Sequence, residues 1–363
     1  MMLSQGATIG IIGGGQLGRM LASAALELGF RVHVYAPPDA DNVAFAAAHK
    51  GVVAAYDDHA AMLAFAQDVD VITYEFENVP VAALEGSQTP VWPPVGALSA
   101  AQDRLVEKAF LETCGFKVAT HLPVNSAAEL DEARKTIPNG FLKARRFGYD
   151  GKGQARIAPG VASDAAMAAI SGVPAILEAA VNFRAETSIV LVRGEDGSTR
   201  SYTPTTNLHD GGILRRTHFE TPLPPQVVDE AARLTAVAAE ALGYVGVITV
   251  EFFVTDDADA PLIANEFAPR VHNTGHWTMD GALTSQFENH IRAVAGWPLG
   301  AVDRIADVTM VNLLGDDIDA LSEHIKNPAA RVHIYNKRAA SPGRKMGHVN
   351  LLKRTVDFDA ERC

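Results

Sequence analysis

Two glutamates, Glu251 and Glu266, lie on segments 246–254 and 261–267, which the sequence predicts to be the two arms of one β-hairpin. Folding the chain about the middle of the loop at 255–260 places the two carboxylates directly opposite each other. Like charges in such a cross-strand pair repel, and neither arm contains Lys or Arg. A hard cation such as Mg²⁺, which usually binds together with phosphate, would relieve the repulsion. The pair therefore predicts a magnesium site, unless a register shift turns one glutamate to solvent.

A glycine-rich segment at 145–154 follows a predicted strand that ends at Lys143. Its glycines, Gly148, Gly151 and Gly153, allow backbone N–H groups to approach an oxyanion closely. The Lys143 ammonium can reach a phosphate as a point charge. The segment matches neither the Walker pattern nor a kinase signature. It predicts a mobile hairpin that covers phosphates, with a purely structural hairpin as the alternative.

A second glycine motif, at 13–18, follows the first predicted strand, opens a helix and matches the dinucleotide-binding fingerprint. A helix N-terminus of this kind accepts anions. The next predicted strand, however, ends at Tyr35 without an acidic side chain to hold a ribose. We therefore expect this loop to contact a ligand through Gln16 and Leu17 rather than to bind NAD.

Several carboxylates follow predicted strands. Glu75 and Glu77 come just after a strand at the edge where open α/β sheets bind ligands. The strand end at 178–181 offers backbone groups that suit an adenine edge, and Glu186 suits ribose hydroxyls. For each of these acids, a solvated surface position is the alternative.

Basic residues cluster in two segments of the later part of the chain. Segment 337–345 carries four cations around a Ser-Pro-Gly turn, and Arg270 and His272 follow the predicted hairpin. In a protein of net charge −12, such a local cluster favours recognition of a small phosphate-bearing ligand. A solvated basic loop is the alternative.

The predicted secondary structure that must position these groups changes along the chain, from alternating strands and helices to a β-rich pattern. Strands at 7–12, 31–35 and 69–74 alternate with helices at 16–28 and 60–67, which predicts a parallel sheet with helices on both faces. A linker is expected at 90–94 and a new helix from Ser99. The pattern then becomes β-rich. The segments expected to be strands there are 140–144, 175–179, 187–192, 309–314 and 331–335.

The amino-acid composition limits the class of protein to which the chain can belong. The 363 residues are 48% hydrophobic, which predicts a globular protein of two or three domains. The net charge of −12 argues against general binding to nucleic acid or anionic membranes. Cys114 and Cys363 have neither a disulfide framework nor a metal-ligand spacing. No apolar run is long enough to span a bilayer and the N-terminus is not a signal peptide, so we expect a cytoplasmic protein.

Six motifs in order along residues 9–348 resemble the ATP-grasp superfamily and, within it, the N5-carboxyaminoimidazole ribonucleotide synthetase family. The motifs are 15–20, 73–79, 147–154, 243–247, 265–277 and 342–348. The resemblance implies a multidomain fold of α/β and α+β parts. Its parts would be a Rossmann-like parallel sheet at 1–100, an ATP-grasp domain at 101–298 with a mobile lid at about 120–190, and a small β-rich domain at 299–363.

The resemblance also implies roles for individual residues, with ATP and Mg²⁺ (or Mn²⁺) bound in the central domain and catalytic roles for Lys143, Lys152 and Arg270. The residues implied around ATP are Arg104, Lys143, Gly148, Tyr149, Asp150, Gly151, Lys152, Gly153, Gln154, Glu178, Ala179, Ala180, Val181, Glu186, His209, Asn265 and Glu266. Glu251 and Glu266 would hold the metal. Those implied around aminoimidazole ribonucleotide are Gln16, Leu17, Glu75 or Glu77, Tyr149, Asp150, Lys152, Arg270 and His272, with Lys337, Arg344 and Lys345 on its phosphate.

The implied reaction converts ATP and bicarbonate to carboxyphosphate, whose carboxyl group passes to the ribonucleotide amine during purine biosynthesis in a cytoplasmic homodimer. One position departs from the superfamily pattern, because Ala268 stands where many ATP-grasp enzymes have a metal-binding Asn. Phosphate oxygens, water or Asn273 should then complete the metal shell. Three alternatives are less favoured: a formate-dependent glycinamide ribonucleotide transformylase, a nicotinamide dehydrogenase and a non-catalytic nucleotide-binding regulator. The transformylase family resembles Gly-Glu-Leu-Gly at the first loop, where this chain has Gly-Gln-Leu-Gly at 15–18.

Overall fold

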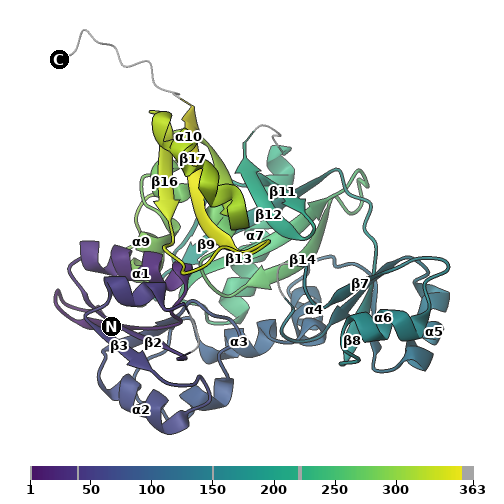
Figure 1. Ribbon diagram of the computed structural model, residues 1–363, viewed down its shortest axis with the longest axis horizontal. Coiled ribbons are helices and arrows are strands. Elements are labelled where there is room, and N and C mark those ends of the chain that lie inside the picture. Colours follow the sequence, from purple (N-terminus) through teal and green to yellow (C-terminus); the bar gives the residue numbers. More distant parts are fainter. Residues whose placement is uncertain (1, 39–40, 149–150, 220–222, 354–363) are drawn as a thin grey trace.

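The computed structural model describes residues 2–38, 41–148, 151–219 and 223–353, which fold around three β-sheets (Figure 1). Among these residues, no helix has both the length and the apolar character needed to cross a membrane. The fold class is the expected mixture of a parallel α/β sheet and antiparallel β-rich parts.

The N-terminal sheet is parallel, with strand order β3-β2-β1-β4. Side chains alternate across β1, so that Ile9 and Ile11 pack with α1 while Ile12 packs with α2 on the other face. Of the four strands in this sheet, the sequence missed β3, because this short edge strand is mostly exposed and lacks an apolar pattern. The elements are β1 (Thr8–Ile12), α1 (Gln16–Glu27), β2 (Arg31–Ala36), η1 (Val43–Ala47), β3 (Lys50–Val53), α2 (His59–Gln67), β4 (Val71–Tyr74) and η2 (Val81–Leu84).

The segment that follows differs from the expectation in two places. The predicted linker at 90–94 contains Val91, which forms a parallel bridge with Ile72 and so extends the sheet edge. The helix expected from Ser99 is two helices, α3 (Val95–Ala101) and α4 (Arg104–Thr113). Asp103 separates them, because it has extended backbone angles and its side chain caps α4 by accepting from the N–H of Leu105 at 3.1 Å.

An antiparallel sheet of order β5-β8-β6-β7 forms a separate lobe, at the lower right of Figure 1, within the segment expected to be a lid. Leu142 packs against the two helices of the lobe, whereas its neighbours Phe141 and Lys143 face the opposite side. The elements are β5 (His121–Val124), α5 (Ala127–Thr136), β6 (Gly140–Ala144), β7 (Gln154–Ile157), α6 (Ser163–Ala169) and β8 (Ala175–Ala179).

The central sheet has nine strands in the order β14-β13-β9-β11-β12-β15-β17-β16, with β10 paired to β9. Helix α7 packs on one face of β13 and α9 packs on the other. Strand β12 pairs with β15, so the C-terminal strands continue this sheet and a domain boundary at residue 298 stays a prediction. The elements are β9 (Ala185–Arg193), β10 (Thr199–Ser201), β11 (Thr205–Asp210), β12 (Ile213–His218), α7 (Pro225–Ala241), β13 (Gly246–Val254), β14 (Leu262–Ala268), η3 (Asn273–Gly275), α8 (Thr278–Gly281), α9 (Gln286–Val294), β15 (Asp307–Leu314), η4 (Gly315–Ala320), α10 (Leu321–Lys326), β16 (Ala330–Ile334) and β17 (Lys345–Lys353).

Candidate active site

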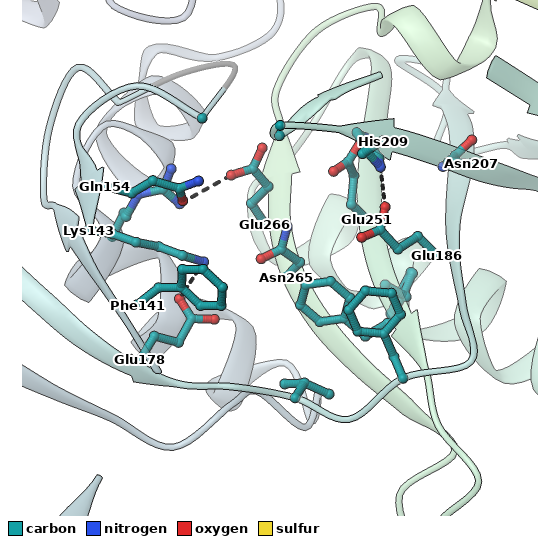
Figure 2. A pocket seen from close by; sticks show the side chains of 18 of the residues that line it. Phe141, Lys143, Gln154, Glu178, Glu186, Asn207, His209, Glu251, Asn265 and Glu266 are labelled. Atoms are coloured by element: carbon teal, nitrogen blue, oxygen red, sulfur yellow. Dashed lines mark hydrogen bonds and ion pairs between the residues drawn. The ribbon is translucent and has the colours of Figure 1, made fainter. Parts of the chain in front are cut away.

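A cavity of about 470 Å³ lies between the lid sheet and the central sheet. Figure 2 shows Lys143 and Glu178 on the lid side, facing Glu266, Glu251 and Glu186 on the central sheet. The predicted ATP residues that line this cavity are Arg104, Lys143, Gly151, Lys152, Gly153, Gln154, Glu178, Ala179, Val181, Glu186, His209, Asn265 and Glu266. Two sheets with charged faces thus enclose one space.

The two arms of the hairpin, β13 and β14, pair with Glu251 directly opposite Glu266, which confirms the predicted register. A β-bulge follows, because the next pair joins Phe252 to Ala264 and leaves Asn265 as the extra residue. Asn265 and Glu266 are consecutive, yet both line the cavity. The bulge therefore directs an amide and a carboxylate to the same side of the strand.

The carboxylates of the pair differ in proton affinity. Burial and the neighbouring charge of Glu266 raise the pKa of Glu251 to about 7. Burial would raise the pKa of Glu266 as well, but the nearby cations, chiefly Arg104, outweigh it and lower that pKa. Arg104 donates to the Glu266 carboxylate at 3.1 Å. Proton and metal ion would therefore compete mainly for Glu251.

The donor set fits a hard cation. The Oδ1 atom of Asn265 is buried without a hydrogen-bond partner among the described residues, and with Glu251 and Glu266 it makes three oxygen donors. No group of three or more His, Cys, Asp or Glu side chains in the described ranges is placed to hold a metal. Asn273 exchanges hydrogen bonds of 3.0 and 2.6 Å with Asn312, so its carbonyl oxygen is already engaged.

On the lid side, a buried carboxylate joins two lysines. Glu178 accepts from Lys143 at 2.8 Å through one oxygen and from Lys108 at 3.1 Å through the other. Burial alone would raise the pKa of Glu178, but the two ammonium groups hold it at about 2. Burial lowers the pKa of Lys143. Glu178 is thus ionised at neutral pH and fixes the position of the Lys143 ammonium in the cavity.

The far end of the cavity combines a charged pair with an aromatic stack. His209 on β11 bonds to Glu186 on β9. Burial would lower the pKa of His209, but this bond and the charge of Glu251 raise it. Phe183 and Phe253 stack with ring centroids 4.7 Å apart and also line the cavity. A flat apolar group could therefore lie beside hydrogen-bonding groups at this end.

The glycine-rich segment connects two paired strands, since Lys143 of β6 lies opposite Gln154 of β7. The pairing of the two hairpin arms is thereby confirmed, whereas the mobility of the segment and its contact with phosphates stay predictions. A Cβ atom on Gly151, whose φ is +76°, would lie 2.6 Å from the carbonyl oxygen of Gly211 in the β11–β12 turn. Tyr149 and Asp150 lie outside the described residues.

A second cavity, of about 650 Å³, lies beside the first and opens toward the N-terminal sheet and the 337–345 segment. It is lined by every described residue that was expected around the second substrate: Gln16, Leu17, Glu75, Glu77, Lys152, Arg270, His272, Lys337, Arg344 and Lys345. Gly148, expected at ATP, lines this cavity and not the first. Arg104, Lys152 and Glu266 line both cavities, so the two spaces meet at these side chains.

Two arginines that line the second cavity are paired with carboxylates, one of which, Glu77, also lines it while the other, Asp41, lies behind the lining. Arg270 binds Glu77 at 2.7 Å, and Arg344 binds Asp41 at 2.6 Å. Burial, aided by the nearby charge of Arg344, lowers the pKa of Lys337 to about 8. These pairs hold the guanidinium groups in place before any ligand arrives.

Glu75 occupies the first glycine motif itself. Its Oε1 atom accepts from the N–H of Gly15 at 2.8 Å. A Cβ atom on Gly13 would lie 2.3 Å from the Glu75 side chain, and one on Gly15 would lie 2.7 Å from its Oε1 atom. Burial raises the pKa of Glu75. The fingerprint glycines thus make room for a carboxylate of the same chain, which supports the expectation that this loop does not bind NAD.

Among the groups in or behind the site that sequence reasoning missed are Phe183 with Phe253, Asp41, and the buried residues Glu107 and Lys108. A signal for the last pair existed, because 104, 107, 108 and 111 form one helical stripe in which only Leu111 is apolar. Conversely, Ala180 lines neither cavity, and its N–H donates to the carbonyl of Asn139.

The two-sheet cavity and the hairpin carboxylates define an ATP-grasp protein, and a profile of the ATP-grasp domain matches residues 109–287. Profiles of the ribonucleotide synthetase preATP-grasp domain and of the phosphoribosylaminoimidazole carboxylase C-terminal domain match residues 6–102 and 308–361. An N5-carboxyaminoimidazole ribonucleotide synthase from Brucella melitensis is 45% identical over 98% of this chain and 99% of its own. The chain therefore belongs to the N5-carboxyaminoimidazole ribonucleotide synthase family.

Solved structures agree with this assignment. The N5-carboxyaminoimidazole synthetase of Staphylococcus aureus complexed with ADP superimposes with a TM-score of 0.91 at 34% identity, covering 98% of this chain and 95% of that one. The N5-carboxyaminoimidazole synthase of Aspergillus clavatus in complex with ADP and 5-aminoimidazole ribonucleotide gives 0.88 at 28% identity, covering 96% and 94%. The likeness extends over nearly the whole chain.

Proposed function

We propose that this protein carboxylates 5-aminoimidazole ribonucleotide to N5-carboxyaminoimidazole ribonucleotide with ATP and bicarbonate, as a step of purine biosynthesis. The observation that carries the proposal is the pair of cavities that meet at Arg104, Lys152 and Glu266. One cavity has the carboxylates and lysines that suit a metal-bound nucleotide, and the other has the cations that suit a ribonucleotide phosphate. The relative solved with ADP and 5-aminoimidazole ribonucleotide supports this pairing of ligands.

In the first cavity, ATP binds between the two sheets. Its adenine lies near the strand end 178–181 and the Phe183–Phe253 stack, and Glu186 accepts from the ribose. Lys143, Lys152 and the neighbouring residues of the 151–154 segment contact the phosphates. Because phosphoryl transfer needs positioning and charge neutralisation more than covalent catalysis, these cations are the main protein contribution.

Mg²⁺ or Mn²⁺ would be held by Glu251 and Glu266, with Asn265 beside them. When bound, the cation neutralises charge on the phosphate oxygens. Because Ala268 supplies no oxygen donor from its side chain, nucleotide phosphates and water would have to supply the remaining ligands. The carboxylate pair therefore binds the cation weakly until the nucleotide is present.

The reaction proceeds in two steps. A bicarbonate oxygen attacks the γ-phosphorus of ATP, the bond from that phosphorus to the bridging oxygen breaks, and carboxyphosphate and ADP form. The exocyclic amine then attacks the carboxyl carbon, the bond from that carbon to the phosphate oxygen breaks, and the amine loses a proton. Carboxyphosphate is short-lived in water, so the adjacency of the two cavities shortens its path and limits its hydrolysis.

In the second cavity, aminoimidazole ribonucleotide lies with its phosphate on Lys337, Arg344 and Lys345. Arg270 and His272 contact its other end, near the meeting point of the cavities. With a pKa of about 8, Lys337 remains mostly charged at neutral pH and so attracts a phosphate. From the family resemblance we further infer a homodimer that acts in the cytoplasm.

ADP release tests the proposal. Purified protein is assayed with Mg²⁺-ATP and either bicarbonate plus aminoimidazole ribonucleotide or formate plus glycinamide ribonucleotide. We expect ADP release that depends on the first pair and yields a carboxylated product. Stimulation by formate and glycinamide ribonucleotide instead would overturn the assignment and favour the transformylase. ATP binding without turnover of either pair would favour a regulator.

A further inference from the structure

Helix α4 contacts strand β14 through three charged side chains on one face, Arg104, Glu107 and Lys108. They contact three consecutive residues of the strand, 265–267, which include the bulge. Lys108 Nζ donates to the carbonyl oxygen of Asn265 at 2.6 Å, and Arg104 Nη1 donates to the carboxylate of Glu266 at 3.1 Å. Glu107 Oε1 accepts from the N–H of Phe267 at 2.7 Å. The helix therefore fixes the bulge residue by residue.

Lys108 differs from the other two because it also reaches the lid. Its ammonium contacts Glu178 of β8 at 3.1 Å, and the other oxygen of Glu178 contacts Lys143 at 2.8 Å. Lys108 is fully buried at 0% exposure and lines neither cavity. One ammonium thus connects the lid wall of the nucleotide cavity to its central-sheet wall.

The burial of this ammonium makes both contacts obligatory. A buried charge without partners is strongly unfavourable, and removing one member of a buried pair leaves the other uncompensated. The extra residue of a bulge is not paired across the ladder, so its carbonyl benefits from an outside donor. Loss of Lys108 would leave the carbonyl of Asn265 without this donor and leave Glu178 to Lys143 alone.

We propose that Lys108 is a positioning residue for nucleotide and metal binding, acting through Glu178 on Lys143 and through the bulge on Asn265 and Glu266. It does not touch ATP. The assignment rests on the proposed function insofar as that function places ATP and the cation in the first cavity. It predicts a defect confined to the nucleotide, because none of the contacts of Lys108 belongs to the second cavity alone.

The test compares Lys108→Met with Lys117→Met. Lys117 donates to the carbonyl of Asp259 at the exposed tip of the same β13–β14 hairpin, far along the strands from Glu251. Calorimetry measures the affinity for a non-hydrolysable ATP analogue with Mg²⁺ and, separately, the affinity for aminoimidazole ribonucleotide. We expect Lys108→Met to weaken the nucleotide affinity by about 10- to 100-fold, as for other groups that orient metal ligands. Its ribonucleotide affinity and both affinities of Lys117→Met should stay within about twofold of wild type.

Two results would overturn the proposal: a folded Lys108→Met protein with wild-type nucleotide affinity, or one whose two affinities weaken in parallel. If circular dichroism shows that Lys108→Met does not fold, Lys108→Gln, which keeps a donor without the charge, decides in the same way. A loss confined to the nucleotide supports the proposal, and an absent or parallel loss overturns it. Because nucleotide binding is measured without turnover, a wild-type protein that fails to carboxylate aminoimidazole ribonucleotide would refute the proposed function and leave this test intact.

Discussion

The Mg²⁺ affinity of the nucleotide complex should depend strongly on pH, because the pKa of Glu251 lies near neutrality. Burial and the charge of Glu266 raise that pKa to about 7. A metal ligand must be deprotonated, so protons and Mg²⁺ compete for this carboxylate. With such a pKa, Glu251 is about one tenth ionised at pH 6 and about nine tenths ionised at pH 8. We therefore expect the Mg²⁺ affinity to fall about tenfold from pH 8 to pH 6, which corresponds to about 1.4 kcal/mol.

The assay is a calorimetric titration of Mg²⁺ into protein saturated with a non-hydrolysable ATP analogue at pH 6, 7 and 8. The nucleotide has its own proton equilibria, so Glu251→Gln serves as the matched control. In that variant Glu266, whose pKa is lowered, stays ionised across the range. Wild type should bind Mg²⁺ more tightly than the variant at pH 8, and the two should converge at pH 6. Parallel pH slopes for the two proteins would refute the reasoning.

Other substitutions test separate parts of the structure. Glu266→Gln should lower ADP production at least about 100-fold, because it removes charge that the cation needs, with the circular dichroism spectrum unchanged; near-normal Mg²⁺-dependent turnover would contradict the metal assignment. Gly18→Ala should lower the unfolding free energy by about 1–3 kcal/mol in denaturant melts, because its Cβ atom would lie 2.5 Å from a backbone oxygen. Gly96→Ala, with nothing within 4 Å, is its control, and equal melts for the two would refute the packing argument. Glu77→Gln should raise the KM for aminoimidazole ribonucleotide about tenfold, because the partner that orients Arg270 at 2.7 Å loses its charge; a matching rise in the KM for ATP would contradict this.

The hairpin register was predictable because its arms are apolar, nearly equal in length and joined by a short polar loop. The bulge at Asn265 was not. The pairs between it and the loop, such as Phe252 with Ala264, would by themselves place Glu251 opposite Asn265, and the extra residue is what sets Glu251 opposite Glu266. Contacts between distant segments were also beyond reach. Lys108 finds its partners 70 and 157 residues along the chain, and a local pattern carries no information about them.

The second cavity also depends on contacts between distant segments, which a local sequence pattern does not reveal. The family resemblance predicted many of the residues that line it. The pairing of Arg344 with Asp41, 303 residues away, depends on how the 337–345 segment packs against the N-terminal sheet. Similarly, the glycine fingerprint was read correctly as a strand–loop–helix turn. The reason for its glycines is Glu75, which follows the neighbouring strand β4 and packs against them from 60 residues away.

The Glu75 carboxylate competes with any external anion for the N–H of Gly15, and it does so as part of the same chain. A group attached to a neighbouring strand is present at an effective concentration of at least the millimolar range, whatever the composition of the solution. A free phosphate or dinucleotide would have to displace this permanent internal ligand from the N–H of Gly15. The loop therefore has the shape of a dinucleotide site in which a carboxylate of the same chain already accepts from the N–H of Gly15. The residues that follow it, Gln16 and Leu17, remain free to line the second cavity.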